Sequence, residues 1–269
     1  MSIIYKNSIL GRKRKYRLGL ALSGGGVRGF AHLGALYAME ELGIKPDIIA
    51  GVSAGSVVAS LYGSGMTPLD IMKQFYYHKF TDFCKVCLPR EGFLNMDGFR
   101  KFLTDNLLVE RIEECPIPTV ICATDIAASE PVQWREGEIA DRVCASCAMP
   151  IVFNPVTIND VDYVDGGVLH NLPAWAIRDE CEILIGMNVS PIIRSKNYTG
   201  SLMDIATRTY HLMARVNSQT DAAMCDVVIS TDSIADLRVF NLKEKERIFK
   251  SGYKSAKSVL LEAKEKLKL

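Results

Sequence analysis

The stretch Gly51-Val52-Ser53-Ala54-Gly55 fits the pattern G-x-S-x-G, and the predicted fold depends on it. It follows the apolar run Ile48-Ile49-Ala50, which is typical of a buried strand, and precedes residues 56–62, which have the composition of a buried helix. A serine on a tight strand-to-helix turn is a nucleophile elbow: the turn lifts the hydroxyl clear of the sheet, and the glycines let neighbouring backbone pass closely. The helix also points its first N–H groups at an oxyanion formed on the serine. An ordinary turn of small residues gives the same pattern, so the rest of the sequence has to distinguish the two.

The length and composition indicate one large α/β domain. The chain has 269 residues, of which 48% are hydrophobic, and this is enough for a sizeable core. Strand-like and helix-like segments alternate without a linker or an internal repeat, which predicts a mainly parallel sheet covered on both faces. The predicted strands are residues 17–22, 47–50, 118–123, 132–135, 161–164, 182–189 and 226–231. The predicted helices are residues 30–42, 56–62, 139–148, 173–178, 201–223 and 243–267, with another starting at residue 67; residues 75–99 are aromatic-rich and irregular.

Basic residues gather at both ends of the sequence, although the formal net charge is only +1. We predict a basic N-terminal arm at residues 1–16 and a single folded domain at residues 17–269. Basic ends around an acidic body disfavour a nucleic-acid partner and permit weak contact with an anionic membrane. No apolar run is long enough to span a bilayer, and no secretory signal follows the basic N-terminus. The eight cysteines are therefore expected to be reduced in a cytoplasmic protein that contacts membranes at most peripherally.

A glycine run follows the first predicted strand. Its spacing, Gly24-x-Gly26-x-x-Gly29, matches the dinucleotide-binding fingerprint. That fold requires an acidic residue at the end of the second strand, about 20 residues further on, to hold a ribose. The second predicted strand ends instead in Gly51-Val52-Ser53, and Asp47 lies at its start. The alternative is a nest of N–H groups at a helix N-terminus that binds an oxyanion or a phosphate, and this alternative also accounts for the serine.

A serine nucleophile needs a base, and none of the four histidines is in a convincing place. His32, His78 and His211 fall in helical surroundings, whereas His170 follows Asp165 closely enough to remain a candidate. Asp165 itself comes after a strand-like run and before two glycines, so its carboxylate can be approached closely. The alternative is an ordinary Asp-Gly turn. An aspartate without a histidine has to lie directly on the serine hydroxyl, because its unperturbed pKa of about 3.9 makes it a weak base.

Taken in order, these motifs resemble the signatures of patatin-like phospholipases. The resemblance rests on residues 23–34, on Gly51-Val52-Ser53-Ala54-Gly55 and on Asp165-Gly166-Gly167, with further similarity at residues 145–155 and 168–173. It implies a three-layer α/β/α fold, hydrolysis of lipid acyl esters by a Ser–Asp dyad, and no metal or cofactor. By this resemblance Ser53 is the nucleophile and Asp165 the base. The predicted oxyanion-hole residues are Gly24, Gly25, Gly26 and Ala54, and the supporting residues are Arg28, Gly29, Gly51, Gly55, Gly166 and Gly167.

The function expected from the resemblance is that of a lipid acyl hydrolase acting on (phospho)lipids. The alternatives are an esterase or thioesterase for soluble acyl compounds and a non-catalytic lipid- or phosphate-binding regulator. Cys147 and His170 depart from the family pattern, and His170 could tune the field at Asp165. The pairs Cys84-x-x-Cys87 and Cys144-x-x-Cys147 would allow a zinc site, but buried thiols are the simpler interpretation. The aromatic segment 75–99 is either core or a flap beside an acyl groove.

Overall fold

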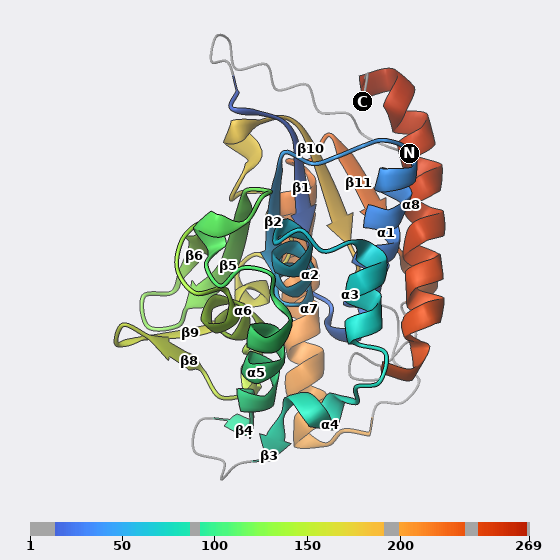
Figure 1. Ribbon diagram of the computed structural model, residues 1–269. Coiled ribbons are helices and arrows are strands. Elements are labelled where there is room, and N and C mark those ends of the chain that lie inside the picture. The colour runs from blue at the N-terminus through green and yellow to red at the C-terminus, as the bar shows by residue number, and fades with distance from the viewer. Residues whose placement is uncertain (1–13, 87–91, 191–198, 235–241, 268–269) are drawn as a thin grey trace.

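Eight strands form the central sheet (Figure 1). The computed structural model describes residues 14–86, 92–190, 199–234 and 242–267. Neighbouring strands from β11 to β5 run parallel, whereas β9, β8 and β6 pair antiparallel. In spatial order the strands are β11 (Val227–Ser230), β10 (Cys181–Asn188), β1 (Tyr16–Leu22), β2 (Ile48–Val52), β5 (Thr119–Asp125), β9 (Val161–Asp165) and β8 (Val156–Ile158), and β6 (Glu130–Trp134) pairs with β5.

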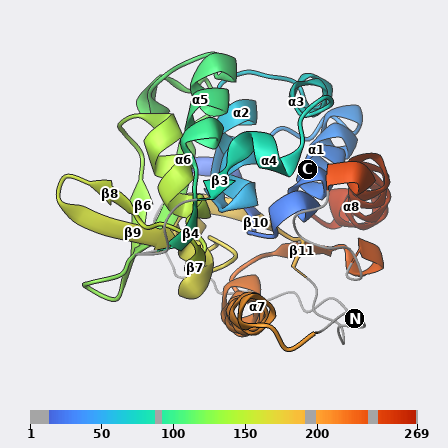
Figure 2. The same ribbon diagram turned by 90° about the horizontal axis from the view of Figure 1, so that it is seen from below.

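Helices cover both faces of this sheet, as the alternating pattern predicted. Most of the helices pack on one face of the sheet and form one hydrophobic core with it. Figure 2 shows α7 apart from them, on the other side of the sheet. The predicted three-layer α/β/α architecture is therefore confirmed. The helices of the first face are α1 (Phe30–Glu41), α2 (Ala54–Gly63), α3 (Pro68–Gln74), α5 (Asp97–Asn106), α6 (Ile139–Cys147) and α8 (Lys245–Leu267); the opposite face carries α7 (Leu202–Ala222) and residues 172–177.

The alternation of side chains along β1 and β2 explains why both faces need cover. Leu18, Leu20 and Leu22 of β1 point into the core under α1 and α8, whereas Ala21 points into the second core under residues 172–177. The same division separates Ile49 of β2 from its neighbours in the strand. Strands that are apolar on both faces are typical of a parallel sheet between helical layers.

Two parts of the predicted secondary structure are wrong. Residues 173–178 are not a helix but a series of turns that ends in a short 3-10 helix, η4 (Arg178–Glu180). Leu172, Ala174, Ala176 and Ile177 all lie in the core, and the backbone bonds from Ala176 N–H to the Pro173 carbonyl oxygen and from Ile177 N–H to the Ala174 carbonyl oxygen close successive turns. Residues 75–99 are not irregular throughout, because they contain α4 (Phe80–Phe83), β3 (Lys85–Val86), β4 (Gly92–Asn95) and the start of α5; β3 and β4 form a small sheet with β7 (Ile151–Phe153).

The predicted N-terminal arm lies mainly outside the described residues. Its last residues are held against the domain, because the Arg14 guanidinium donates hydrogen bonds to the carbonyl oxygens of Arg178 (2.7 Å) and Cys181 (2.6 Å). Lys15 lies over the ring of Tyr16, which opens β1. Among the described helices, none has the length and apolar character that a membrane crossing requires.

Candidate active site

Ser53 lies between β2 and α2 in a strained backbone conformation. Its φ of 52° and ψ of −125° lie where a residue with a side chain is rarely found. The two glycines of the motif are needed for close packing of backbone on backbone: a Cβ atom on Gly51 would lie 2.4 Å from the Gly55 carbonyl oxygen, and one on Gly55 would lie 2.1 Å from that of Leu22. The predicted nucleophile elbow therefore has the expected backbone geometry, with Ser53 at its apex.

The hydroxyl of Ser146, on α6, links the elbow to β5, a contact that the sequence did not reveal. The Ser53 N–H donates to the Ser146 hydroxyl oxygen (2.8 Å), and that hydroxyl donates to the Cys122 carbonyl oxygen on β5 (2.6 Å). The Ser56 hydroxyl donates to the Ser53 carbonyl oxygen (2.7 Å). With both backbone groups of Ser53 engaged, its side-chain hydroxyl is left to face the pocket.

The register of β5 brings Asp165 level with Ser53. Val52 pairs with Cys122 on one side of β5, and Asp165, the last residue of β9, pairs with Ala123 on the other. The Asp165 Oδ1 accepts a hydrogen bond from the Gly167 N–H (2.9 Å), and the Ser53 and Tyr210 hydroxyls interact with the same carboxylate. A Cβ atom on Gly166 would lie 3.0 Å from the Cys122 carbonyl oxygen, and one on Gly167 would lie 2.1 Å from the Tyr210 hydroxyl oxygen. Both predicted supporting glycines therefore pack closely around the carboxylate.

Burial sets the basicity of Asp165. The residue is only 2% exposed, and desolvation raises its pKa to about 6, although the hydrogen bonds from Gly167, Ser53 and Tyr210 act in the opposite direction. A carboxylate with this pKa is ionised at neutral pH and is a much better proton acceptor than an exposed aspartate. The neighbouring thiol of Cys147 does not compete as a nucleophile, because burial and the charge of Asp165 hold its pKa well above its usual value.

The glycine-rich loop after β1 faces the elbow, but Gly24 does not have the predicted role. Its N–H donates to the Asn171 carbonyl oxygen (3.0 Å) and is thus unavailable to an oxyanion. Gly26 (φ 58°) opens the 3-10 helix η1 (Gly26–Gly29), and Ala54 opens α2. The first N–H groups of a helix have no acceptor within it, so the available donors are those of Gly26 and Ala54, with Gly25 beside them in the pocket wall.

Gly29 and His32 fix the position of this loop. A Cβ atom on Gly29 would lie 2.8 Å from that of Ala54, so a larger residue would separate the two helix starts. His32 is fully buried and its Nε2 is 2.8 Å from the Ser23 carbonyl oxygen, which can only accept; Nε2 therefore carries the proton. Burial lowers the pKa of His32 to about 4 and keeps the ring neutral. His32 is thus a histidine of the core. Arg28 is buried as well.

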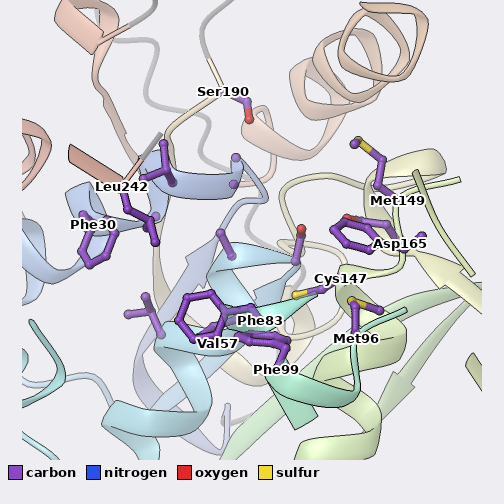
Figure 3. A pocket seen from close by; sticks show the side chains of 18 of the residues that line it. Phe30, Val57, Phe83, Met96, Phe99, Cys147, Met149, Asp165, Ser190 and Leu242 are labelled. Carbon is purple, nitrogen blue, oxygen red and sulfur yellow. The ribbon is translucent and has the colours of Figure 1, made fainter. Parts of the chain in front are cut away.

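Ser53 and Asp165 line a pocket with a volume of about 180 Å³ (Figure 3). The remaining wall is mostly aliphatic and aromatic, and its other polar side chains are those of Asn171, Ser190, Tyr210 and His211. In Figure 3, Asp165 and Cys147 lie on one side near Met96 and Met149, opposite Phe30 and Leu242. The aromatic segment 75–99 borders this pocket through Phe75, Phe83, Cys84, Met96 and Phe99, in agreement with the predicted flap position.

The sequence model of the patatin-like phospholipase family matches residues 20–177. The chain belongs to this family. It is 32% identical over 161 residues to an uncharacterised NTE family protein of Mycobacterium bovis, covering 58% of this chain and 44% of that one. It is 31% identical over 172 residues to a lysophospholipase NTE1 of Cryptococcus neoformans, covering 61% of this chain and 10% of that one. The chain thus spans less than half the length of these relatives.

The fold of the chain is shared with VipD from Legionella pneumophila. The superposition has a TM-score of 0.56 at 15% sequence identity and covers 92% of this chain and 67% of that one. At this identity the likeness concerns the fold, with its mostly parallel sheet between layers of helices.

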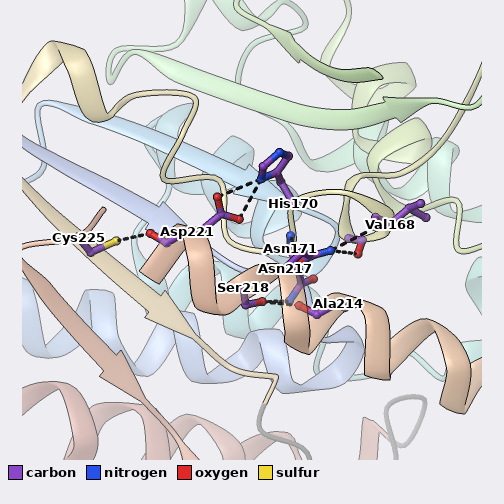
Figure 4. A network of polar contacts seen from close by, with 9 residues as sticks. Val168, His170, Asn171, Ala214, Asn217, Ser218, Asp221 and Cys225 are labelled. Atoms are coloured by element: carbon purple, nitrogen blue, oxygen red, sulfur yellow. Dashed lines mark hydrogen bonds and ion pairs between the residues drawn. The ribbon is translucent and has the colours of Figure 1, made fainter. Parts of the chain in front are cut away.

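Helix α7 contributes residues to this patatin-like site that sequence reasoning missed. The Tyr210 hydroxyl interacts with the Asp165 carboxylate. Asn217 donates to the carbonyl oxygens of Gly167 (2.9 Å) and Val168 (3.2 Å), just after Asp165 (Figure 4). The Asn171 N–H donates to the Asn217 side chain (3.0 Å). These contacts join residues about fifty positions apart, and only the helical spacing of Tyr210, Ala214 and Ser218 could have indicated the buried face of α7.

The other histidines do not touch Asp165. His170 lies 3.0 Å from the buried carboxylate of Asp221 on α7, so it pairs with a different acid from the one expected (Figure 4). His78 lies 3.6 Å from Asp82. His211 lines the pocket, and its pKa falls to about 4 because of desolvation first and the charges of Arg28 and Arg208 second.

The proposed zinc pairs remain untested as a set, since Cys87 lies outside the described residues. Cys84 and Cys144 are buried and Cys147 faces the pocket. Within the described ranges, no three His, Cys, Asp or Glu side chains are grouped as metal ligands.

Proposed function

We propose that this protein is a lipid acyl hydrolase that cleaves carboxylic esters with Ser53 as nucleophile and Asp165 as base. The observation that carries the proposal is the position of Ser53 at the apex of a strained elbow, where its hydroxyl interacts with the buried carboxylate of Asp165 in the wall of an apolar pocket. Membership of the patatin-like phospholipase family supports hydrolysis of a lipid, and a relative named lysophospholipase supports an ester of glycerol as the bond that is cleaved.

In the first half-reaction the Ser53 oxygen attacks the ester carbonyl carbon while Asp165 accepts the hydroxyl proton. The carbonyl oxygen becomes an oxyanion, which the N–H groups of Gly25, Gly26 and Ala54 would hold at two helix starts. The intermediate collapses as its bond to the alcohol breaks, and Asp165 returns the proton to the departing oxygen. In the second half-reaction water attacks the acyl-serine, Asp165 takes its proton, and the acid leaves as Ser53 recovers a hydrogen.

The substrate class follows from the pocket wall. Its apolar side chains suit an acyl chain and offer few partners to a polar substituent. An esterase or thioesterase for soluble acyl compounds would use the same residues, so the distinction rests on how the rate depends on substrate aggregation. A lipid- or phosphate-binding regulator without turnover is the non-enzymatic alternative.

Labelling with a fluorophosphonate tests the nucleophile. Ser53 of the wild-type protein should react, and Ser53→Ala should abolish labelling and ester hydrolysis while thermal unfolding stays cooperative. The matched control is Ser60→Ala, because Ser60 is a buried serine of α2 outside the pocket lining. Turnover above background in Ser53→Ala would refute the assignment, and absence of labelling in the wild type would favour the regulator.

Substitution of the base separates the dyad from a histidine triad. Asp165→Asn should lower kcat by about two to four orders of magnitude, whereas replacing His170 or His211 singly should cost far less.

Rates on one phospholipid below and above its critical micelle concentration should rise on aggregation for a lipid hydrolase. A soluble-substrate esterase would show no such rise.

A further inference from the structure

Four exposed aliphatic residues lie on the outward face of α7. Leu202 (68% exposed), Ile205 (46%), Leu212 (46%) and Val216 (68%) follow one another at intervals of three, seven and four residues, and we call them the α7 stripe. This spacing places them on one side of a helix about 30 Å long. The opposite side packs on the domain through Tyr210 and other buried residues. A helix with one face buried in protein normally presents polar residues outward, so the α7 stripe indicates a second contact surface.

The helix that carries this stripe is also a wall of the candidate active site. Tyr210 and His211 line the pocket, one turn or less from Leu212. Strand β7 contacts α7, lies beside it in Figure 2 and adds Ile151, which is 47% exposed. Ile151 has a φ of 73°, a conformation that strains a β-branched residue, and its neighbours Met149 and Phe153 line the pocket. Residues of α7 and the neighbours of the exposed Ile151 thus line the same pocket.

The charge beside the α7 stripe is positive. Arg208 and Arg215 follow Ile205 and Leu212 by three positions, so both flank the stripe on the same side. The two acidic residues of α7 face other partners: Asp204 accepts hydrogen bonds from Thr199 near the start of the helix, and Asp221 is buried against His170. An aliphatic stripe with arginines along its edge fits a lipid surface with anionic headgroups, which accepts apolar side chains without requiring a matching shape.

We propose that the α7 stripe, with Ile151, docks on the surface of anionic lipid aggregates and presents the pocket wall to the substrate. Binding to the aggregate does not depend on the proposed function, whereas delivery of a substrate to the pocket rests on it. The arginines then lie at the level of the lipid phosphates. Asn217 and the pair of Asp221 with His170 keep α7 fixed to the segment after Asp165 (Figure 4), so docking does not depend on a rearrangement of the site.

Co-sedimentation with vesicles tests the docking surface. Wild-type protein, Leu212→Glu/Val216→Glu and the control Leu261→Glu are mixed with vesicles of phosphatidylcholine containing about one third phosphatidylglycerol. Leu261 is a suitable control because it is 53% exposed on α8, away from α7 in Figure 1. The double variant should bind at least about tenfold more weakly than wild type, since it loses two apolar contacts and gains two repelled charges, and the control should bind as wild type. Hydrolysis of a monomeric soluble ester should stay within about twofold in all three proteins.

Equal vesicle binding by wild type and the double variant would overturn the proposal, as would a wild type that does not bind. A wild type that dimerises through this face, with the double variant monomeric in sedimentation velocity, would assign the stripe to a second copy and overturn it too. Loss of binding on removal of residues 1–13, with the double variant unaffected, would assign membrane contact to the N-terminal arm. If no protein hydrolyses the soluble ester while the binding difference persists, docking stands and the proposed function fails.

Discussion

At the scale of single residues, the candidate site depends on how Asp165 is balanced between burial and hydrogen bonding. Burial favours the neutral acid, whereas the Ser53 and Tyr210 hydroxyls and the Gly167 N–H favour the carboxylate. The result is a pKa of about 6, so a base at this position loses activity as the pH falls through that value. Of these three partners, Ser53 is the reacting group and the Gly167 N–H is local backbone. Tyr210 is the third, and it acts as a positioning residue for Asp165.

Replacing Tyr210 with Phe should move the acidic limb of the kcat/KM profile to higher pH. Removal of the donor leaves burial less opposed, so the pKa of Asp165 rises further above 6 and less carboxylate is present at pH 6–7. Tyr62→Phe is the matched control, because Tyr62 is a buried tyrosine outside the pocket lining. It should alter stability without moving the limb. An unchanged limb in Tyr210→Phe would reduce Tyr210 to a packing role.

At the scale of secondary-structure elements, long periodic segments were predictable and short ones were not. The long helices, and strands such as β1, β2, β10 and β11, agree with the sequence-based ranges to within a few residues, because repeated burial on one or both faces fixes their periodicity. Residues 173–178 have too few positions to establish a period, and tertiary packing selected turns. The strands β3, β4 and β7 are two to four residues long, and pairing between distant segments creates them.

The same division applies to the candidate site. Ser53 and Asp165 were predictable because each follows a strand within a motif of fixed local geometry. Gly24 was misassigned as an oxyanion donor because its N–H is engaged by Asn171, more than a hundred residues away. Tyr210 and Asn217 were missed because nothing within α7 itself shows that its inner face meets the segment after Asp165.

The contact between α1 and α8 yields a prediction for two glycines. A Cβ atom on Gly34 would lie 2.0 Å from the Phe249 carbonyl oxygen, and one on Gly252 would lie 2.0 Å from that of Ala31. Alanine at either position should lower the free energy of unfolding by about 1–3 kcal/mol, because the helices have to move apart. The gain in helix propensity of roughly 1 kcal/mol is too small to offset this in full.

Denaturant unfolding measures this effect, and Ser258→Ala provides the control. Ser258 is exposed on the same helix, so its replacement should change stability by less than about 0.5 kcal/mol. Stability equal to wild type in both Gly34→Ala and Gly252→Ala would show that the two backbones do not approach as closely as described.

At the scale of the whole molecule, the sheet fixes where reacting groups meet. The parallel strands β1, β2 and β10 end at one edge, and the antiparallel β9 delivers Asp165 to that edge across β5. The helical layers then exclude water from the carboxylate. A buried charge that serves catalysis is therefore a cost to folding, and this cost should appear as a dependence of stability on pH.

Asp165→Asn should make the protein more stable at pH 8 although it removes most of the activity. The folded-state pKa of Asp165 is raised from 3.8 to about 6, so ionisation in the buried site destabilises the native state fully above pH 6, and this effect disappears as the pH falls below 3.8. A neutral amide keeps the shape and an acceptor for the Gly167 N–H. The gain in the free energy of unfolding should be about 1–3 kcal/mol at pH 8 and clearly smaller at pH 4.5. Urea unfolding at the two pH values measures this gain.

Ser53→Ala is the control, since it also removes activity but leaves the carboxylate buried, and it should show no such gain. A gain in Asp165→Asn that is equal at both pH values would mean that packing or hydrogen bonding, and not the buried charge, limits the stability of the native state.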